Sequence, residues 1–461
     1  MSRNRTYLSA TLGEVAAACS GTVEERWESI AVAGVSTDTR ELAAGELFVA
    51  LEGQKHDGHD YLGAALEQGA VGAVVSKPGR APGDLPLVVV ADTLRALGAL
   101  GAWHRSKMPA RVAAITGSTG KTTTKDMLGQ ILLRLGPSVV AEGTQNNEIG
   151  VPMTLLRVSA EDRFCVLELA MRGPGEIDYL AGIARPDVGV ITNIGQSHVG
   201  RLGSREAIVQ AKAELLGHLR DDAVAVLNAD DFFFSVLSAM SEAPVVSFGI
   251  DSEADFRGLQ IDDGGVDSVG FRMVTPMGEA DVRMRVPGRH TVMNALAAGA
   301  AAAHFGAGLD QIVTALEEHE GSAMRLQRTA GRGGAILLND AYNASPDSVR
   351  AALNVLGSAA GRRVFVFGDM LEMGAEGEPA HREAGRAVAE AGVEWLITVG
   401  ELAELAGQEA EKLGVRVDRV REAGDAVELL RPELTKGDVV LVKASRGMGL
   451  ERVVEALADD S

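Results

Sequence analysis

One stretch in the first third of the chain, AAITGSTGKTTTKDML, constrains the fold more than any other. An apolar run ends at Thr116, Gly117 and Gly120 allow a tight turn, Lys121 follows, and residues 122–124 open a helix. This order directs backbone N–H groups and a helix N-terminus toward an anion, and the lysine adds a positive charge. It predicts a phosphate loop of the short G-x-x-G-K-T form, because Ile115 stands where the longer motif has its first glycine. The alternative is a turn that only caps a helix.

Three segments of the 461-residue chain differ in pattern, and this length suggests roughly three domains at about 150 residues each. Residues 1–90 mix short strand-like runs with turns and end in the cluster KPGRAPGDLP, so we expect a small N-terminal α/β domain followed by a linker. Residues 91–322 carry the phosphate loop among buried-strand runs, which predicts a mostly parallel sheet with antiparallel strands added at one edge between about 245 and 287. In residues 323–461 the strand candidates AILLND, RVFVFGD, EWLITVG and DVVLVKAS alternate with helical stretches, which predicts a Rossmann-like, doubly wound domain.

Polar residues of this last segment follow its predicted strands. The runs AILLND, RVFVFGD and DVVLVKAS end at Asp340, at Asp369 and at residues 443–446. In doubly wound sheets ligands bind at the carboxyl ends of the strands, so we expect a ligand there.

The composition excludes several classes of protein. The chain has 44 basic and 64 acidic residues, a net charge of -20, which disfavours nucleic acid and anionic membrane surfaces as partners. Two cysteines, Cys19 and Cys165, cannot form a disulfide framework or a cysteine zinc cluster and fit a reducing compartment. No run reaches the roughly 18 apolar residues of a membrane span. We therefore expect a cytoplasmic protein and, without an apolar repeat or coiled-coil pattern, a monomer.

Three further residues are candidates for metal chemistry. Glu168 interrupts the apolar run FCVLELAM, where a carboxylate could bind magnesium beside the phosphate loop or simply face solvent. Lys212 falls inside a helical apolar stripe, so it could lose its proton and react with carbon dioxide to give a carbamate, or extend its ammonium group to solvent. His198 follows the strand VGVITNIG, where it could bind metal or remain unligated.

The chain closely resembles the Mur ligases, the ATP-dependent amide-forming enzymes of bacterial peptidoglycan synthesis, over all three of their domains. The similarity is carried by TGSTGKTTT, TNIGQSHVGRLGS with AKAEL, GRHTVMNALAA, and SAMRLQR followed by LNDAYNASPDS. Within the family it is most similar to the members that join D-alanyl-D-alanine to UDP-N-acetylmuramoyl-tripeptide. That similarity rests on GVSTDTRELAAGELFVALEGQKHDGHDY, TQNNEIGVPMTLL, VFGDMLEMG and LVKASRGMGLE, and on the lack of a D-N-P-R element in the last domain.

The resemblance implies ATP, two magnesium ions and a carbamylated lysine, and it assigns site residues to each ligand. For ATP it implies Gly117, Ser118, Thr119, Gly120, Lys121, Thr122 and Thr123, with Asn294 on adenine, Arg325 on the phosphates and Asp340 on ribose. For magnesium it implies Thr122, Glu168, His198 and the carbamate of Lys212; Lys121, Glu168, His198 and Lys212 are the catalytic set. For the UDP-sugar, in domain 1–90, it implies Asp38, Thr39, Arg40, Asp57, Gly58 and His59. For the muramoyl-peptide and the dipeptide it implies Gln145, Asn146, Asn147, Asn343, Ser345, Lys443, Ser445 and Arg446.

The sequence departs from the family at two positions and leaves rival interpretations. Family members commonly have Asn where this chain has Ser345, and Gly where it has Ala444. Because Ser345 precedes Pro346, it is equally suited to cap a helix. The segment GDML could be a dipeptide-side loop or only a turn. A folylpolyglutamate synthase-like ligase should lack the DTRELAAGELFVAL domain, and a nucleotide switch would need an N-K-x-D element, which the sequence lacks.

Overall fold

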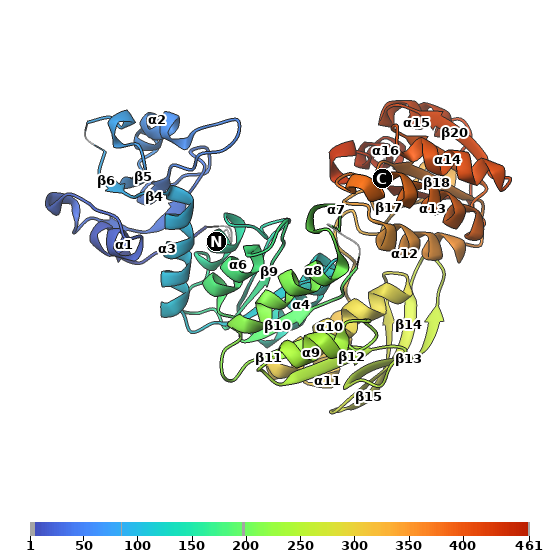
Figure 1. Cartoon of the computed structure of the whole chain (residues 1–461), viewed down its shortest axis with the longest axis horizontal. Helices are drawn as coiled ribbons and strands as arrows, with labels where there is room; N and C mark the ends of the chain where they lie inside the picture. The colour runs from blue at the N-terminus through green and yellow to red at the C-terminus, as the bar shows by residue number, and fades with distance from the viewer. Residues whose placement is uncertain (1–4, 84, 196–198, 460–461) are drawn as a thin grey trace.

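A computed structural model describes residues 5–83, 85–195 and 199–459 of the chain. It confirms the predicted fold class of three α/β domains with mostly parallel sheets, and the first and last of them lie at opposite ends of the central one (Figure 1). In the described part of the chain no helix is long and apolar enough to cross a membrane.

The N-terminal domain is built on four parallel strands in the order β3-β4-β5-β6. The strands are β3 (Gly34–Ser36), β4 (Glu46–Val49), β5 (Gly72–Val75) and β6 (Leu87–Val89), with helices α1 (Leu12–Ala18) and α2 (Leu62–Glu67) and a separate pair, β1 (Ala10–Thr11) and β2 (Ala31–Val32). The Pro/Gly cluster does not lead out of this sheet, because β6 follows it. Helix α3 (Thr93–Lys107), capped by Asp92, makes the connection to the central sheet.

The central sheet has nine strands in the order β15-β14-β13-β12-β11-β10-β7-β9-β8. They are β7 (Arg111–Thr116), β8 (Ser138–Val140), β9 (Phe164–Glu168), β10 (Val188–Ile191), β11 (Val224–Asn228), β12 (Val245–Gly249), β13 (Phe256–Asp263), β14 (Val269–Thr275) and β15 (Gly278–Met284). The antiparallel edge predicted between about 245 and 287 is present as β13, β14 and β15, whereas β12 pairs in parallel with both of its neighbours. The phosphate-loop strand β7 lies between β9 and β10, with Ile115 opposite Glu168 and Thr116 opposite Ile191.

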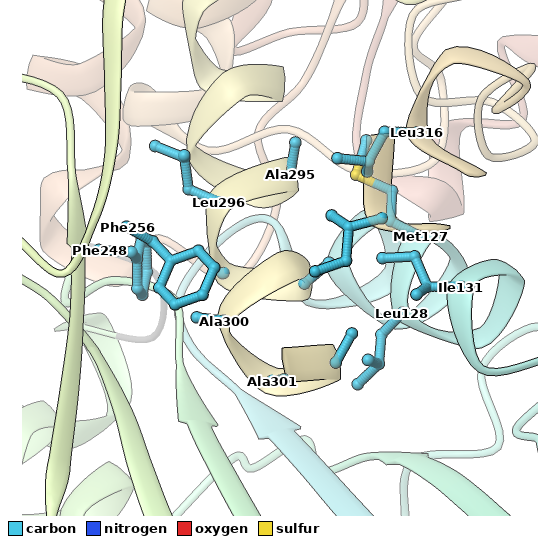
Figure 2. Packing of buried hydrophobic residues seen from close by; sticks show 14 of the residues in the cluster. Met127, Leu128, Ile131, Phe248, Phe256, Ala295, Leu296, Ala300, Ala301 and Leu316 are labelled. Atoms are coloured by element: carbon cyan, nitrogen blue, oxygen red, sulfur yellow. The ribbon is translucent and has the colours of Figure 1, made fainter. Parts of the chain in front are cut away.

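Helices cover both faces of the central sheet. One face packs against α4 (Lys121–Leu135), α10 (Arg289–His304) and α11 (Leu309–Glu317), and the other against α5 (Gly150–Leu155), α6 (Glu176–Ala184), α8 (Arg205–Ala213) and α9 (Phe234–Met240); α7 (Val199–Leu202) precedes α8. Figure 2 shows α10 between two groups of side chains, with Phe248 and Phe256 of the sheet on one side and Met127 and Leu128 of α4 on the other. The many buried alanines of α10 let α4 approach closely, which fixes the phosphate-loop helix against the sheet.

The C-terminal domain is a six-stranded sheet in the order β16-β17-β21-β18-β19-β20. Its strands are β16 (Gln327–Gly331), β17 (Ala335–Asn339), β18 (Arg363–Gly368), β19 (Trp395–Val399), β20 (Arg416–Val420) and β21 (Val439–Lys443). Helices α12 (Pro346–Gly357), α13 (Gly377–Glu390) and α14 (Ala403–Lys412) cover one face, and α15 (Ala423–Leu430) and α16 (Glu451–Leu457) the other. The four strands predicted here are β17, β18, β19 and β21. The edge strands β16 and β20 are partly exposed and polar, so their sequences lack an apolar run.

Candidate active site

The glycine turn after β7 has the geometry of a phosphate loop. Gly117 and Gly120 have φ of 148° and 80°, in the region that favours glycine. A Cβ at Gly117 would lie 1.8 Å from Thr192 Oγ1, and one at Gly120 would lie 2.3 Å from Asn294 Oδ1. Any other residue would be strained at both positions, and α4 begins directly after Gly120 at Lys121. The prediction of a strand, a glycine turn and a helix is confirmed.

The residues that follow β10 hold this loop in place. Thr192 Oγ1 donates a 2.6 Å hydrogen bond to Thr119 O, and Asn193 Oδ1 accepts one of 3.0 Å from the backbone N–H of Thr119. The side-chain amide of Asn193 donates to Thr119 Oγ1 at 2.8 Å. The TNIG motif therefore fixes the loop from the neighbouring strand.

Glu168 is the centre of a polar cluster at the end of β9. It is 3% exposed, and Thr122 Oγ1 donates to its Oε2 at 2.7 Å while Asn146 Nδ2 donates to its Oε1 at 2.9 Å. Lys121 Nζ donates to Gly117 O at 2.9 Å. Burial lowers the pKa of Lys121, an effect that the nearby Glu168 carboxylate partly offsets. Glu168 therefore does not face solvent, and the alternative in which it is an ordinary exposed side chain is wrong.

Lys212 is a buried lysine in α8 without a counter-charge among the residues that the structure describes. It is 2% exposed, and its Nζ forms no hydrogen bond or ion pair with any residue that the structure describes. Burial holds the pKa of Lys212 well below its ordinary value, and the positive charge of Lys121 lowers it further. The interpretation in which the ammonium group reaches solvent is wrong, because the helix buries the whole side chain.

The groups at this end of the sheet fit magnesium. A hydroxyl and a carboxylate oxygen, those of Thr122 and Glu168, lie side by side, and oxygen is the ligand that magnesium prefers. Within residues 5–83, 85–195 and 199–459 no three His, Cys, Asp or Glu side chains form a metal cage. Magnesium commonly needs none, because substrate phosphates and waters complete its shell. His198, the remaining predicted ligand, lies outside the described residues.

A cavity of about 860 Å³ joins the phosphate loop to the C-terminal domain. It is lined by many of the residues predicted for ATP and the peptide substrates: Ser118, Thr119, Gly120, Lys121, Thr123, Asn146, Asn147, Glu168, Asn294, Arg325, Asp340, Asn343, Ser345 and Lys443. Gly117, Thr122 and Gln145 are not part of this lining; Gln145 Oε1 accepts a hydrogen bond from Thr154 Oγ1 at 3.0 Å. Motifs of the central and C-terminal domains thus converge on one site.

The C-terminal domain reaches the phosphate loop through Arg325. Its Nη2 donates to Thr122 Oγ1 at 2.9 Å, and its guanidinium carbon lies 4.3 Å from the centre of the Tyr342 ring. The flanking residues Met324 and Leu326 have φ of 56° and 52°, which is uncommon without glycine. Residues 322–326 therefore form a constrained connection between the two domains, which we call the hinge segment.

Some predicted C-terminal residues serve the domain itself. Ser445 Oγ accepts from Leu371 N at 2.8 Å, and Arg446 pairs with Glu451 at 3.0 Å; neither lines the cavity. Asp369 of GDML accepts the backbone N–H of Ala403 at 2.7 Å. Ser345 occupies the N-cap position of α12, as its alternative interpretation required, and also lines the cavity. Further along the GDML loop, Glu372 lines the cavity as well.

The residues predicted for the UDP-sugar lie in the N-terminal domain and do not line the cavity. Asp38 accepts from Arg40 Nε at 2.9 Å, and this hydrogen bond holds the pKa of Asp38 below its usual range. Thr39 lies between them. Asp57 precedes Gly58 and lies 2.6 Å from Nδ1 of the buried His59; hydrogen bonds from Lys77 and His59 hold its pKa far below the ordinary value.

Sequence reasoning missed several residues that line the cavity, His290, Tyr342, Arg95 and Tyr179 among them. His290 and Tyr342 stand inside the motifs GRHTVMNALAA and LNDAYNASPDS and could have been found there. Arg95 of α3 and Tyr179 of α6 carried no sequence signal, because only the fold brings them together, with the guanidinium carbon 4.4 Å from the ring centre.

Comparison with known proteins agrees with this geometry. Residues 31–104 match the model of the Mur ligase family catalytic domain, residues 115–302 the Mur ligase middle domain, and residues 324–446 the Mur ligase glutamate ligase domain. The UDP-N-acetylmuramoyl-tripeptide--D-alanyl-D-alanine ligases of Escherichia coli and Bacillus subtilis are 37% and 35% identical to the chain; the alignments cover 98% and 97% of it and 99% and 98% of those enzymes.

Two solved structures have the same fold along nearly the whole chain. A crystal structure of MurF from Acinetobacter baumannii has a TM-score of 0.90 at 33% identity and covers 98% of this chain and 99% of its own. MurF ligase from Thermotoga maritima in complex with ADP has a TM-score of 0.81 at 26% identity and covers 92% and 96%. With its motifs gathered at one cavity and full-length relatives above 30% identity, the chain belongs to the Mur ligase family.

Proposed function

We propose that the protein joins D-alanyl-D-alanine to UDP-N-acetylmuramoyl-tripeptide and converts ATP to ADP and phosphate in the same reaction. The full-length similarity to ligases of that name supports the substrate pair, and the cavity between the phosphate loop and the C-terminal domain carries the proposal. One domain then serves each ligand: the N-terminal domain the UDP-sugar, the central domain ATP, and the C-terminal domain the dipeptide. We place this reaction in the bacterial cytoplasm, carried out by a monomer.

The reaction activates a carboxylate as an acyl phosphate. The acceptor carboxylate attacks the γ-phosphorus of ATP, ADP leaves, and the dipeptide amine then displaces phosphate from the acyl carbon. Both partners of the first step are anions, so the site must offset their repulsion. Lys121 and the loop amides face that charge, and Arg325 enters from the C-terminal side.

Magnesium would be held by Thr122 and Glu168, with His198 as a further ligand. Bound there, the metal supplies charge neutralisation and orientation of the phosphates. Asn146 keeps the Glu168 carboxylate oriented through its 2.9 Å hydrogen bond. A carbamate on Lys212 would supply an anionic oxygen donor for a second magnesium ion. The burial of this side chain, which favours the neutral amine, supports that modification.

The C-terminal residues of the cavity have distinct tasks in this proposal. Asn343 and Ser345 offer polar groups to the incoming dipeptide, and Asp340 lies beside them for the ribose. Approach of this domain excludes water, which would otherwise hydrolyse the acyl phosphate.

An isotope experiment tests the chemistry. If the acceptor carboxylate carries oxygen-18, acyl-phosphate formation transfers one labelled oxygen to the released phosphate. We expect mass spectrometry to detect singly labelled phosphate together with the UDP-muramoyl-pentapeptide. Unlabelled phosphate beside the amide product would contradict the acyl phosphate, and the absence of the amide product would contradict the proposed function.

A further inference from the structure

Lys125 is a buried cation that the proposed reaction does not use. It lies on α4 one turn after Lys121 and is 2% exposed. Its Nζ donates a 2.6 Å hydrogen bond to Ala141 O and lies 3.0 Å from Asp126 Oδ1. A charge at this depth is costly unless it is paired, and an apolar side chain would pack on the same helix face without that cost. The ammonium group therefore needs an explanation beyond packing.

The carbonyl that Lys125 binds begins the loop that carries the predicted acceptor amides. This loop, residues 141–149, is called the amide loop here. Its Asn146 reaches Glu168, and the backbone N–H of Ala170 donates to Asn146 O at 2.9 Å. The middle of the amide loop is thus tied to the end of β9, and Lys125 ties its start to the phosphate-loop helix.

The counter-ion of Lys125 is itself held from a third side. Asp126 Oδ2 accepts a hydrogen bond from Ser322 Oγ of the hinge segment, on the same face of α4 where Thr122 meets Arg325. Thr122 and Asp126 are one helical turn apart, so their contacts with Arg325 and Ser322 hold the hinge segment at two neighbouring points of α4. Asp126 cannot turn away from Lys125 without breaking its contact with Ser322, which leaves the ammonium group little freedom.

We propose that Lys125 is a positioning residue for the acceptor: it sets the start of the amide loop so that Asn146 and Asn147 face the muramoyl-peptide carboxylate. The inference rests on the proposed function, since it names the ligand that the amide loop holds. It concerns acceptor binding and not ATP binding, because Lys125 binds Ala141 O and, unlike Lys121, does not line the cavity.

Lys125→Met tests this, because methionine keeps an unbranched chain and removes the donor. We expect the KM for UDP-N-acetylmuramoyl-tripeptide to rise about tenfold or more, the loss that corresponds to one charged hydrogen bond, while the KM for ATP stays within about twofold. A second variant, Lys125→Gln, retains a hydrogen-bond donor on a shorter side chain. Its KM for UDP-N-acetylmuramoyl-tripeptide should lie between those of Lys125→Met and the wild type.

Arg105→Met is the matched control. Arg105 is also a buried cation, 6% exposed. It donates to a backbone carbonyl, Ala184 O, at 3.1 Å and pairs with Asp187 at 3.2 Å. It lies on α3 but, unlike Arg95 of the same helix, does not line the cavity. The Arg105→Met variant should have a lower thermal stability than the wild type and an unchanged KM for the acceptor.

Hydrogen exchange separates positioning from general destabilisation. In Lys125→Met we expect faster exchange confined to residues 141–149, with α4 and β9 protected as in wild type. An unchanged KM for the acceptor would overturn the inference, as would parallel losses for both substrates with exchange raised throughout the domain. Acceptor-dependent phosphate release by the wild type is measured first: its absence refutes the proposed function, whereas its presence with an unaltered Lys125→Met enzyme refutes this inference alone.

Discussion

Lys443 Nζ lies 2.6 Å from Asp340 Oδ2, so two residues expected to serve different ligands form one ion pair. They stand at the carboxyl ends of β21 and β17, which are neighbours in the sheet, and Lys443 also donates to Asn343 O at 2.9 Å. Lys443 is 2% exposed. The pair therefore shapes the C-terminal wall of the cavity, and its energetics can be tested separately from catalysis.

Loss of one partner should destabilise the protein strongly. Lys443→Met leaves the Asp340 carboxylate without its counter-charge, and we expect the free energy of unfolding to fall by about 3–5 kcal/mol in denaturant titrations. In the double variant Lys443→Met/Asp340→Asn, more than half of that loss should be recovered. Additive losses would show that the pair is not coupled.

Acid should weaken the C-terminal domain through His381. This side chain is fully buried, and its burial lowers the pKa of His381. Its Nε2 accepts a hydrogen bond from the Met370 N–H at 2.9 Å, and its Nδ1 donates one to Gly377 O at 2.6 Å. Below about pH 6.5 the unfolded chain then binds more protons than the folded one, so stability falls as pH drops from 6.5 toward the folded pKa.

The measurement for His381 is the free energy of unfolding between pH 7 and pH 5. His381→Gln should give a shallower decline than wild type, by at most about 1.4 kcal/mol per pH unit. Some decline should remain, because burial lowers the pKa of His104 and His319 in the same direction. The exposed His56→Gln is the control, and an equal slope in wild type and His381→Gln would refute the assignment.

Several features of fold and site could be predicted because they depend on local sequence. The phosphate loop needs two glycines and a lysine at fixed spacing, and strands β17, β18, β19 and β21 are buried apolar runs. The apolar stripe of α8 indicated that the stem of Lys212 is buried, but it left open whether the ammonium group reaches solvent. Such patterns reflect periodicity and turn geometry, which neighbouring residues determine.

Other features depend on contacts between distant segments. Nothing near Ser445 or Asp369 in sequence indicates that their side chains bond Leu371 N and Ala403 N inside the domain. Strand β20, RVDRV, escaped prediction because an edge strand needs only one covered side. The meeting of Arg95 with Tyr179 requires α3 and α6 to pack together, which neither sequence reveals.

Lys212→Ala should lose activity by about 10- to 100-fold, the range for loss of a group that orients a metal site. Because burial lowers the pKa of Lys212 well below its ordinary value, a larger share of its amine is neutral and reactive toward carbon dioxide at a given pH than in an ordinary lysine. A short-chain carboxylate such as formate should partly restore turnover in phosphate-release assays. Failure of rescue would leave Lys212 as a packing residue.

Ligand binding should close the C-terminal domain over the phosphate loop. The hinge segment, with its two residues of positive φ, provides the pivot for this motion. The contact between Arg325 and Thr122 marks where the C-terminal domain meets the phosphate-loop helix. With a non-hydrolysable ATP analogue and UDP-N-acetylmuramoyl-tripeptide, small-angle scattering should report a smaller radius of gyration than for the free protein. Identical curves would count against closure.

The most direct test of the central claim is phosphate release with ATP and magnesium while each peptide substrate is omitted in turn. An ATP-dependent ligase of this specificity should release phosphate rapidly only when UDP-N-acetylmuramoyl-tripeptide and D-alanyl-D-alanine are both present. Equal release without either substrate would contradict the assignment of this cavity to amide formation.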